Sequence, residues 1–402
     1  MVSIIDDIAL AQVGEKKQQW VRDQMKVLDS FRQRYVKEQP YKGKKIVVCM
    51  HCEPKGAVRT EALLAGGAEE IIFVGNLGST KPETAAYLAT LPRVTVLAKQ
   101  HDTLEDLNRY VELALAEKAD LFMDNGASLM LCYNRKRPDW KPMGAIEETR
   151  SGQLLLEKEG VCPEFPLLVI DDSPVKRLIE NEAGVGQSVV DGFMRATNML
   201  LGGKKLLIIV YGFCGQGIAQ RFRALGASTM VYDIDPLRRL KAHIEGHAVG
   251  RLESLLPQAD AVITVTGRFD IVGPNQVAHM KHKAILCNAG HYNMEICVGE
   301  LERSATQIET LSDGLRRFSF GEKDIYLLQE GNPLNLSAAA GNPLEIMEVG
   351  YALQLLSLEK ILNSDGLTPG IHPLPDDINS KTSFVFAHGV IHSVSEWIQW
   401  SG

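Results

Sequence analysis

The sequence has no long hydrophobic run and no concentrated stripe of positive charge, and we expect no signal peptide. No apolar stretch approaches the ~20 residues that a helix needs to span a bilayer. The N-terminus carries Asp6 and Asp7 where a signal peptide needs positive charge. A net charge of −7 argues against nucleic acid as a partner, because nucleic-acid affinity rests on many cationic contacts. We therefore expect a cytoplasmic protein with a small-molecule ligand, no membrane partner and no nucleic acid.

The cysteines are too scattered for a disulfide framework. There are seven, an odd number, which favours reduced thiols in a reducing compartment. Cys49 and Cys52 form a CxxC around His51, but a structural zinc site needs further ligands at comparable spacing, and the sequence has no second CxxC. We predict buried cysteines at a strand end and no metal site, with a metal or redox pair as the alternative.

The most informative stretch is LLIIVYGFCGQGIAQRFRALGASTMVYD at 206–233. It is typical of an apolar strand, a glycine turn, an amphipathic helix and a second strand that ends on Asp233. Gly212, Gly215 and Gly217 let the backbone bend, approach a pyrophosphate and begin a helix whose N-terminus attracts anions. A carboxylate at the end of the second strand suits a ribose 2′-hydroxyl and repels the phosphate of NADP. The stretch predicts an NAD site, although its spacing is GxxGxG rather than GxGxxG.

Short apolar strands alternate with helical stretches along most of the chain. We expect one series of strands at 45–50, 71–75, 94–98, 121–125 and 167–171, and a second series that begins at 206 and continues at 229–233, 261–267 and 284–290. This rhythm predicts an α/β protein with two doubly wound parallel-sheet domains in tandem, the second of them a Rossmann domain. Ahead of the strands, residues 15–37 predict one capping helix with an apolar stripe of Trp20, Met25, Leu28, Phe31 and Tyr35.

Motifs along nearly the whole chain resemble the S-adenosylhomocysteine hydrolase family. In the first series they are MHCEPKG at 50–56, GST at 78–80, DNG at 124–126, EETRSG at 147–152 and DDSPVKRLIEN at 171–181. In the second series they are the run 186–220 and then YDIDP, TVTGRFDIV, CNAGHYNMEI and NPLNLSAAAGNP, all in the order of the family. The C-terminus departs from the family, because it lacks the basic, tyrosine-containing tail of the long members.

The resemblance implies hydrolysis of the C5′ thioether of S-adenosyl-L-homocysteine, or of a close analogue, to a nucleoside and homocysteine. Bound NAD would oxidise the 3′-hydroxyl, which acidifies the C4′ proton and allows loss of the thiol, addition of water and re-reduction. One alternative is a diverged enzyme that applies this chemistry to another 5′-substituted nucleoside. The other is a catalytically silent relative that binds NAD and nucleosides.

Five residues take catalytic roles by this resemblance. His51 and His291 match the histidines that transfer protons near the ribose and the leaving group. Glu148 matches the glutamate that holds a ribose hydroxyl, and Lys176 lies in the segment whose lysine chemistry lowers the barrier to 3′-oxidation. Glu180 replaces an aspartate of that segment.

Two neutral amides stand where the family carries other groups: Asn125 replaces a carboxylate and Asn342 replaces a histidine near the purine. Because an amide cannot take up a proton, these positions bear on which substrate is used. The substrate-binding residues implied by the resemblance are Glu53, Asn125, Glu148, Lys176, Glu180 and Asn342. The implied NAD contacts are Thr149, Arg150, Ser151, Asn181, Gly212, Phe213, Cys214, Gly215, Gln216, Gly217, Asp233, Arg238, Ala289, Gly290, His291 and Asn335.

The resemblance also implies the domain plan. We expect a substrate domain at 1–185, a Rossmann NAD-binding domain at 186–343 that is inserted in it, and a C-terminal segment at 344–402 that completes the substrate domain. The two domains would close by hinge motion. The family further implies a homo-oligomer, either a tetramer or a dimer.

Overall fold

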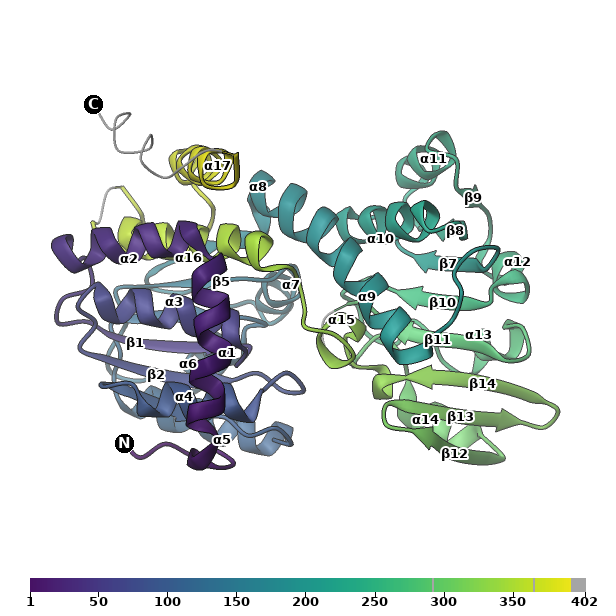
Figure 1. Cartoon of the computed structure of the whole chain (residues 1–402), viewed down its shortest axis with the longest axis horizontal. Coiled ribbons are helices and arrows are strands. Elements are labelled where there is room, and N and C mark those ends of the chain that lie inside the picture. The colour runs from purple at the N-terminus through teal and green to yellow at the C-terminus, as the bar shows by residue number, and fades with distance from the viewer. Residues whose placement is uncertain (291–292, 364–365, 392–402) are drawn as a thin grey trace. The chain divides into compact units, whose positions relative to one another are not determined.

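The computed structural model describes residues 1–290, 293–363 and 366–391, and it divides the chain into two compact units (Figure 1). Residues 1–177 and 344–402 make up the first unit, and residues 178–343 make up the second. The second unit is therefore inserted in the first. Our sequence boundary at 185/186 falls inside the helical stretch with which the second unit begins, and the assignment of substrate binding to the first unit stays a prediction.

The first unit is built on a seven-stranded sheet in the order β15-β6-β5-β4-β1-β2-β3, with all neighbours parallel. The strand order reverses between β1 and β4, the kind of position where open α/β sheets bind ligands. The sequence analysis missed β5 and β15. Its strands are β1 Lys45–Met50, β2 Glu70–Gly75, β3 Val94–Leu97, β4 Leu121–Asp124, β5 Gly144–Glu147, β6 Pro166–Val169 and β15 Gly370–Pro373.

Helices cover both faces of this sheet, and each face has its own hydrophobic core. On one face pack α1 Ala11–Gln24, α2 Lys26–Glu38, α3 Pro54–Ala65, α4 Pro82–Thr90 and α16 Leu344–Leu362. On the other face pack α5 Leu104–Ala116, α6 Ser128–Lys136 and α7 Arg150–Lys158. α17 Asp376–Ile391 packs on α16, so the C-terminal segment belongs to this unit.

The prediction of one capping helix over 15–37 was wrong. Two helices, α1 and α2, meet at Met25, whose non-helical backbone (φ −91°, ψ 72°) breaks the register between them. Met25, Leu28, Phe31 and Tyr35 are buried as predicted, whereas Trp20 is 64% exposed. The 3.6-residue repeat is interrupted at such a break, so the side chains of α1 do not continue the apolar stripe of α2.

The second unit has an eight-stranded sheet in the order β12-β13-β14-β11-β10-β7-β8-β9. The part from β9 to β14 is parallel and has the strand order of a Rossmann fold, with the reversal between β7 and β10. β12, β13 and β14 form an antiparallel edge that the sequence analysis did not predict. The strands are β7 Lys205–Ile209, β8 Ser228–Tyr232, β9 Ala248–Val249, β10 Ala261–Thr264, β11 Ala284–Asn288, β12 Gln307–Ser312, β13 Leu315–Phe320 and β14 Lys323–Leu328.

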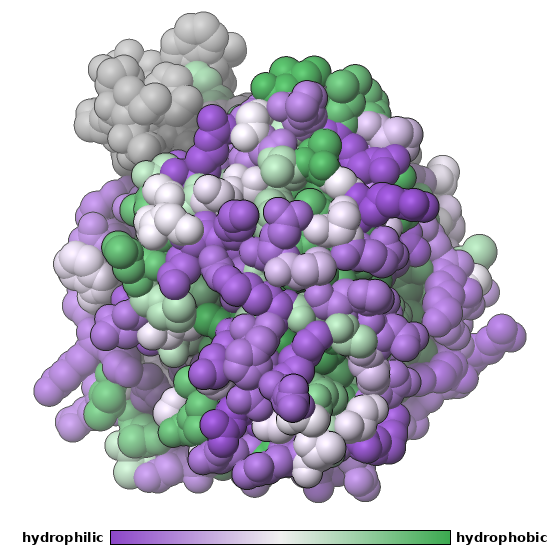
Figure 2. All heavy atoms as spheres, turned by 90° about the vertical axis from the view of Figure 1, so that its right-hand side faces the viewer, coloured by the Kyte–Doolittle hydropathy of each residue, from purple (hydrophilic) through white to green (hydrophobic). Residues whose placement is uncertain are grey.

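Helices also line both faces of the second sheet. α9 Val185–Thr197, α10 Phe213–Ala224 and α15 Leu334–Ser337 share one core, and α12 Leu252–Leu255, α13 Pro274–His279 and α14 Val298–Ser304 share the other. α11 Pro236–Ile244 follows β8. In Figure 2 the hydrophobic residues on the visible face are scattered among hydrophilic ones.

Helix α1 approaches α4 so closely that only glycine fits at position 14. A Cβ on Gly14 would lie 2.0 Å from the Glu83 carbonyl oxygen. Replacing a helical glycine by alanine ordinarily stabilises a helix by about 1 kcal/mol. We predict instead that Gly14→Ala lowers the free energy of unfolding by roughly 1–3 kcal/mol, because the helices must separate. Gly299→Ala in α14, where the nearest atom is 3.5 Å away, is the control; equal urea midpoints for the two variants would contradict the prediction.

Candidate functional site

In the first unit the polar residues that follow β1, β4 and β5 meet at one edge of the sheet. The register pairs Cys49 with Asp124 and Asp124 with Glu147, so the residues after these positions are neighbours. His51 follows β1 and Glu148 follows β5. Parallel pairing therefore brings together candidates that are far apart in the sequence.

His51 is held as a neutral ring with a defined tautomer. Its Nδ1 lies 2.7 Å from Ser79 Oγ, and that hydroxyl donates to the Asn76 carbonyl. We assign the tautomer in which Nδ1–H donates to Ser79 Oγ and Nε2 is the proton acceptor, because the hydroxyl donates to Asn76. Burial lowers the pKa of His51 to about 4, so the ring is neutral at physiological pH. A general base requires this form.

Glu148 and Lys176 form a buried ion pair. Lys176 Nζ lies 2.9 Å from Glu148 Oε1 and donates to the Glu148 carbonyl, and the two side chains are 3% and 5% exposed. Gln354 of α16 donates to Glu148 Oε2. The short helix α8 Pro174–Lys176 is capped by Ser173, whose hydroxyl donates to Asn379 Oδ1 of α17. The C-terminal segment thus supports the lysine, a role that sequence reasoning did not assign.

The loop after β4 is held by two buried carboxyl groups. Glu147 accepts from the backbone N–H groups of Gly126, Ala127 and Thr149 at 2.8–2.9 Å, and from the Thr149 hydroxyl. Asp124 accepts from its own loop and from the start of α6. Burial, and next the charge of Glu147, raises the pKa of Asp124 well above its usual range. Sequence reasoning missed Glu147, although it stands first in EETRSG.

Asn125 is placed by a neighbouring amide. Asn76 Nδ2 donates to the Asn125 carbonyl at 3.0 Å and to its Oδ1 at 3.1 Å. Asn125 is 7% exposed. Its side-chain oxygen is therefore turned toward Asn76.

A second charged group lies at the start of α3. Lys55 Nζ is 2.5 Å from Glu53 Oε2, and the Tyr351 hydroxyl donates to Glu53 Oε1. The Arg59 guanidinium lies 5.1 Å from the centroid of the Tyr351 ring. Only Glu53 was predicted from sequence. Lys55 and Arg59 are cations one helical turn apart on α3, and that spacing could have found them.

The residues after Glu148 begin helix α7. Thr149 is its N-cap and accepts from Gly152 N–H, and the Ser151 hydroxyl donates to the Thr149 hydroxyl. Arg150 is exposed and donates to Gln153. NAD contacts by these residues stay a prediction.

The glycine turn of the second unit has the geometry of a phosphate-binding turn. Gly212 caps α10, and a Cβ there would meet no atom closer than Arg238 Nη1 at 4.0 Å. A Cβ on Gly215 would lie 2.1 Å from the Val210 carbonyl oxygen, and one on Gly217 would lie 1.9 Å from that of Glu182. Gly212 therefore leaves open space, while Gly215 and Gly217 permit close packing. Phe213 and Cys214 follow Gly212 in the first turn of α10.

Asp233 lies immediately after β8. Its Oδ2 accepts from Tyr211 N–H at 2.7 Å and its Oδ1 from Asp235 N–H at 2.9 Å. Gln216 donates to the Tyr211 carbonyl. Arg238 Nη1 is 3.8 Å from Asp233. The predicted acid is thus tied directly to the glycine turn.

The loop after β11 carries the next candidates. Asn288 Oδ1 accepts from Gly290 N–H, and Ala289 donates to the Thr264 carbonyl. The buried Glu295 accepts from Thr266 and Gly267, a support that sequence reasoning missed. His291 lies outside the described residues.

Asn335 and Asn342 are joined by a serine. Asn335 Nδ2 donates to Ser188 Oγ at 3.4 Å, and Ser188 donates to Asn342 Oδ1 at 2.8 Å. Glu180 and Asn181 lie in the π-helical turn Arg177–Gly184, in the part that belongs to the second unit. Lys176, in contrast, belongs to the first unit.

Two family models together match residues 3–341. Residues 3–211 match S-adenosyl-L-homocysteine hydrolase, and residues 181–341 match the NAD binding domain of S-adenosyl-L-homocysteine hydrolase. The chain belongs to the S-adenosyl-L-homocysteine hydrolase family. It is therefore a hydrolase-type enzyme, and its cofactor is NAD. The glycine turn and Asp233 lie within the matched NAD region.

Relatives named for two substrates are similar over nearly the full length. S-inosyl-L-homocysteine hydrolase of Methanocaldococcus jannaschii is 37% identical over 377 residues, covering 92% of this chain and 90% of that one. Adenosylhomocysteinase of Thermococcus kodakarensis is 37% identical over 386 residues, with coverage of 94% and 91%. Adenosylhomocysteinase of Nostoc sp. is 33% identical over 384 residues, with coverage of 94% and 90%.

The remaining features of the described residues do not add a metal or membrane site. Cys49 and Cys52 are buried and free, and within residues 1–290, 293–363 and 366–391 no cluster of three or more metal-ligating side chains occurs. None of the helices in that part of the chain is both long and apolar enough to cross a membrane.

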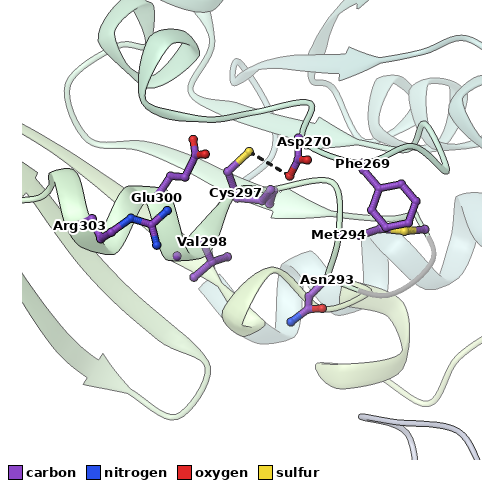
Figure 3. Close-up of a pocket in the computed structure, with 10 residues that line it drawn as sticks. Phe269, Asp270, Asn293, Met294, Cys297, Val298, Glu300 and Arg303 are labelled. Atoms are coloured by element: carbon purple, nitrogen blue, oxygen red, sulfur yellow. Dashed lines mark hydrogen bonds between the residues drawn. The ribbon is translucent and has the colours of Figure 1, made fainter. Parts of the chain in front are cut away.

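A surface hollow of about 390 Å³ lies on the second unit (Figure 3). Cys297 Sγ, which belongs to its lining, lies 3.5 Å from Asp270 Oδ1. Burial, followed by the hydrogen bond to Asp270, raises the pKa of Cys297 to about 11, so the thiol stays protonated at neutral pH. Among the described residues that line this hollow, none is predicted to contact NAD or substrate. It is lined by Phe269, Asp270, Asn293, Met294, Ile296, Cys297, Val298, Gly299, Glu300 and Arg303.

Alanine substitutions at two glycines of the NAD turn should have different effects, one on NAD affinity and the other on stability. We predict that Gly212→Ala keeps the fold, costing at most about 1 kcal/mol, and lowers NAD affinity at least tenfold by filling the space left for the pyrophosphate. Gly215→Ala should instead destabilise the protein by roughly 3 kcal/mol, because its Cβ meets a backbone oxygen. Calorimetric titration with NAD and thermal unfolding measure both. Unchanged NAD affinity in Gly212→Ala would refute the assignment.

Burial of neutral His51 predicts a pH dependence of stability. Between pH 6.5 and about 4 the unfolded histidine binds a proton and the folded one does not, so stability falls as pH is lowered through this window. The shift corresponds to roughly 3 kcal/mol. We expect His51→Gln to lose less stability than the wild type between these pH values in urea unfolding. His101→Gln, at an exposed position, is the control; parallel curves for wild type and His51→Gln would contradict the prediction.

Proposed function

We propose that the protein hydrolyses the C5′ thioether of an S-nucleosyl-L-homocysteine to the nucleoside and L-homocysteine. The observation that carries this proposal is the buried ion pair of Glu148 and Lys176. Glu148 and the neutral His51 both lie at the carboxyl ends of strands of the first sheet. S-adenosyl-L-homocysteine and its inosyl analogue are the two candidate substrates, because the relatives are named for both.

Each residue of the cluster has a task that its chemistry suits. The Glu148 carboxylate accepts a hydrogen bond from a ribose hydroxyl, and the Lys176 ammonium donates to the 3′-oxygen as that oxygen gains carbonyl character. Gln354 and the helix cap at Ser173 hold the pair in place. This buried arrangement favours charge changes on the ribose, because fixed partners compensate them without rearrangement of water.

His51 handles protons near the leaving group. Its Nε2, left basic by the Nδ1–H bond to Ser79, accepts a proton from the ribose carbon or from the attacking water. The departing thiolate then takes up a proton. His291 is proposed as a second proton-transfer group by the family resemblance.

The second unit fits NAD by its own geometry. Gly212 leaves room for a pyrophosphate at the N-terminus of α10, and Asp233 stands at the end of β8. Phe213, Cys214, Gly215, Gln216, Gly217, Arg238, Ala289, Gly290 and Asn335 are proposed to line this cofactor site. Bound NAD supplies a hydride acceptor for the ribose and returns the hydride, so the net reaction is hydrolysis.

The test is to load the purified protein with NAD and add S-adenosyl-L-homocysteine or S-inosyl-L-homocysteine. We expect the absorbance of NADH to appear and mass spectrometry to detect homocysteine with adenosine or inosine. Lys176→Met should slow the reaction at least ~100-fold, as loss of a proton-handling or charge-stabilising group does. Lys158→Met, at an exposed position on α7, is the control. Firmly bound NAD with neither reduction nor products for both substrates would refute the proposal.

A further inference from the structure

Arg59 is a buried cation in the interior of α3. Its side chain is among the largest that are fully buried, at 1% exposure. Nη1 donates to Gln354 Oε1 at 2.8 Å and to the Met50 sulfur, which are neutral acceptors. Burial lowers the pKa of Arg59, although the neighbouring Tyr351, Glu148 and Glu53 oppose that effect.

One edge of the Arg59 guanidinium is not used by the described part of the chain. Among these residues, no acceptor reaches Nε or Nη2. These two nitrogens carry the parallel N–H bonds of the side-on fork, the pair that binds two adjacent acceptors in one plane. Burying such donors without acceptors is costly, and an acceptor brought by a ligand would remove that cost.

The surroundings indicate where this edge lies. A Cβ built on Gly56, one turn earlier on α3, would be 3.9 Å from Arg59 Nη2 and 3.8 Å from the Tyr351 hydroxyl. The Tyr351 hydroxyl in turn donates to Glu53. The fork, a carboxylate acceptor and an aromatic ring thus occur together, and Gln354 links them to Glu148.

We propose that Arg59 determines substrate specificity by binding the N7 and O6 atoms of a 6-oxopurine, with Glu53 accepting from N1–H. This inference rests on the proposed function and names the base of its substrate. A 6-oxopurine presents two acceptors and then a donor along one edge, which matches two arginine donors and one carboxylate. Adenine has a donor in place of O6 and opposes the fork. An amino-acid carboxylate would use the fork but would face Glu53.

The primary experiment compares kcat/KM for S-inosyl- and S-adenosyl-L-homocysteine in the NAD-loaded protein. We expect the wild type to prefer the inosyl substrate at least tenfold. Arg59→Leu should lose about 10- to 100-fold for the inosyl substrate, mainly in KM, with little loss for the adenosyl substrate. Arg22→Leu is the control, because its guanidinium is engaged by Glu61 and Tyr87 away from this cluster. Equal losses on both substrates would assign Arg59 to the homocysteine carboxylate and overturn the proposal.

Nucleoside binding to the wild-type protein tests the inference even when neither thioether is turned over and when Arg59→Leu does not fold. Inosine and 7-deazainosine differ only in the N7 acceptor, so the wild-type protein should bind 7-deazainosine about tenfold more weakly. In Arg59→Leu the two nucleosides should bind alike. Equal wild-type affinities for both would overturn the role of Arg59. Absence of turnover with either thioether, but with the N7 effect present, would refute the proposed hydrolysis alone.

Discussion

The first unit depends on the Glu147 carboxylate. This group is fully buried at the end of β5 and accepts four hydrogen bonds, from Gly126, Ala127 and Thr149. The four bonds hold the loop after β4 and the start of α7 against the same strand end. Asn125 and Glu148 flank these anchor points, so their positions follow from a residue that need not itself contact substrate. A carboxylate with this many partners has a structural role, because each lost donor would leave a buried oxygen with fewer hydrogen bonds.

Around that anchor the site gathers more charge than a protein interior ordinarily holds. Glu53 with Lys55, and Glu148 with Lys176, are paired, and His51 is kept neutral. Buried pairs of this kind add little to stability, since desolvation offsets their attraction. The pairs do fix the orientation of the charged side chains, as the proposed chemistry requires. Arg59 follows the same logic, with two N–H groups left for an acceptor.

In the second unit the constraint is different, because a dinucleotide must come close to the protein backbone. Val210, which directly follows β7, adopts a left-handed conformation (φ 82°) that is rare for a β-branched residue. Its carbonyl oxygen is packed against Gly215, and Tyr211 donates to Asp233. Backbone strain of this kind persists only where surrounding contacts determine it, and it is common at ligand sites. The glycine turn and the acidic strand end are therefore one connected structure.

The sequence by itself determined the α/β class, the tandem sheets, the glycine turn with Asp233, and the family, because these depend on local periodicity and on short motifs. It did not determine the break at Met25 or the antiparallel strands β12 to β14, where local pattern and tertiary packing diverge. Only the tertiary structure brought Gln354, Tyr351 and Asn379 from the C-terminal segment to residues of the first half. Such contacts carry no spacing signal. Hydrogen-bond satisfaction in a buried site is a property of the folded neighbourhood, and it alone decides what Arg59 lacks.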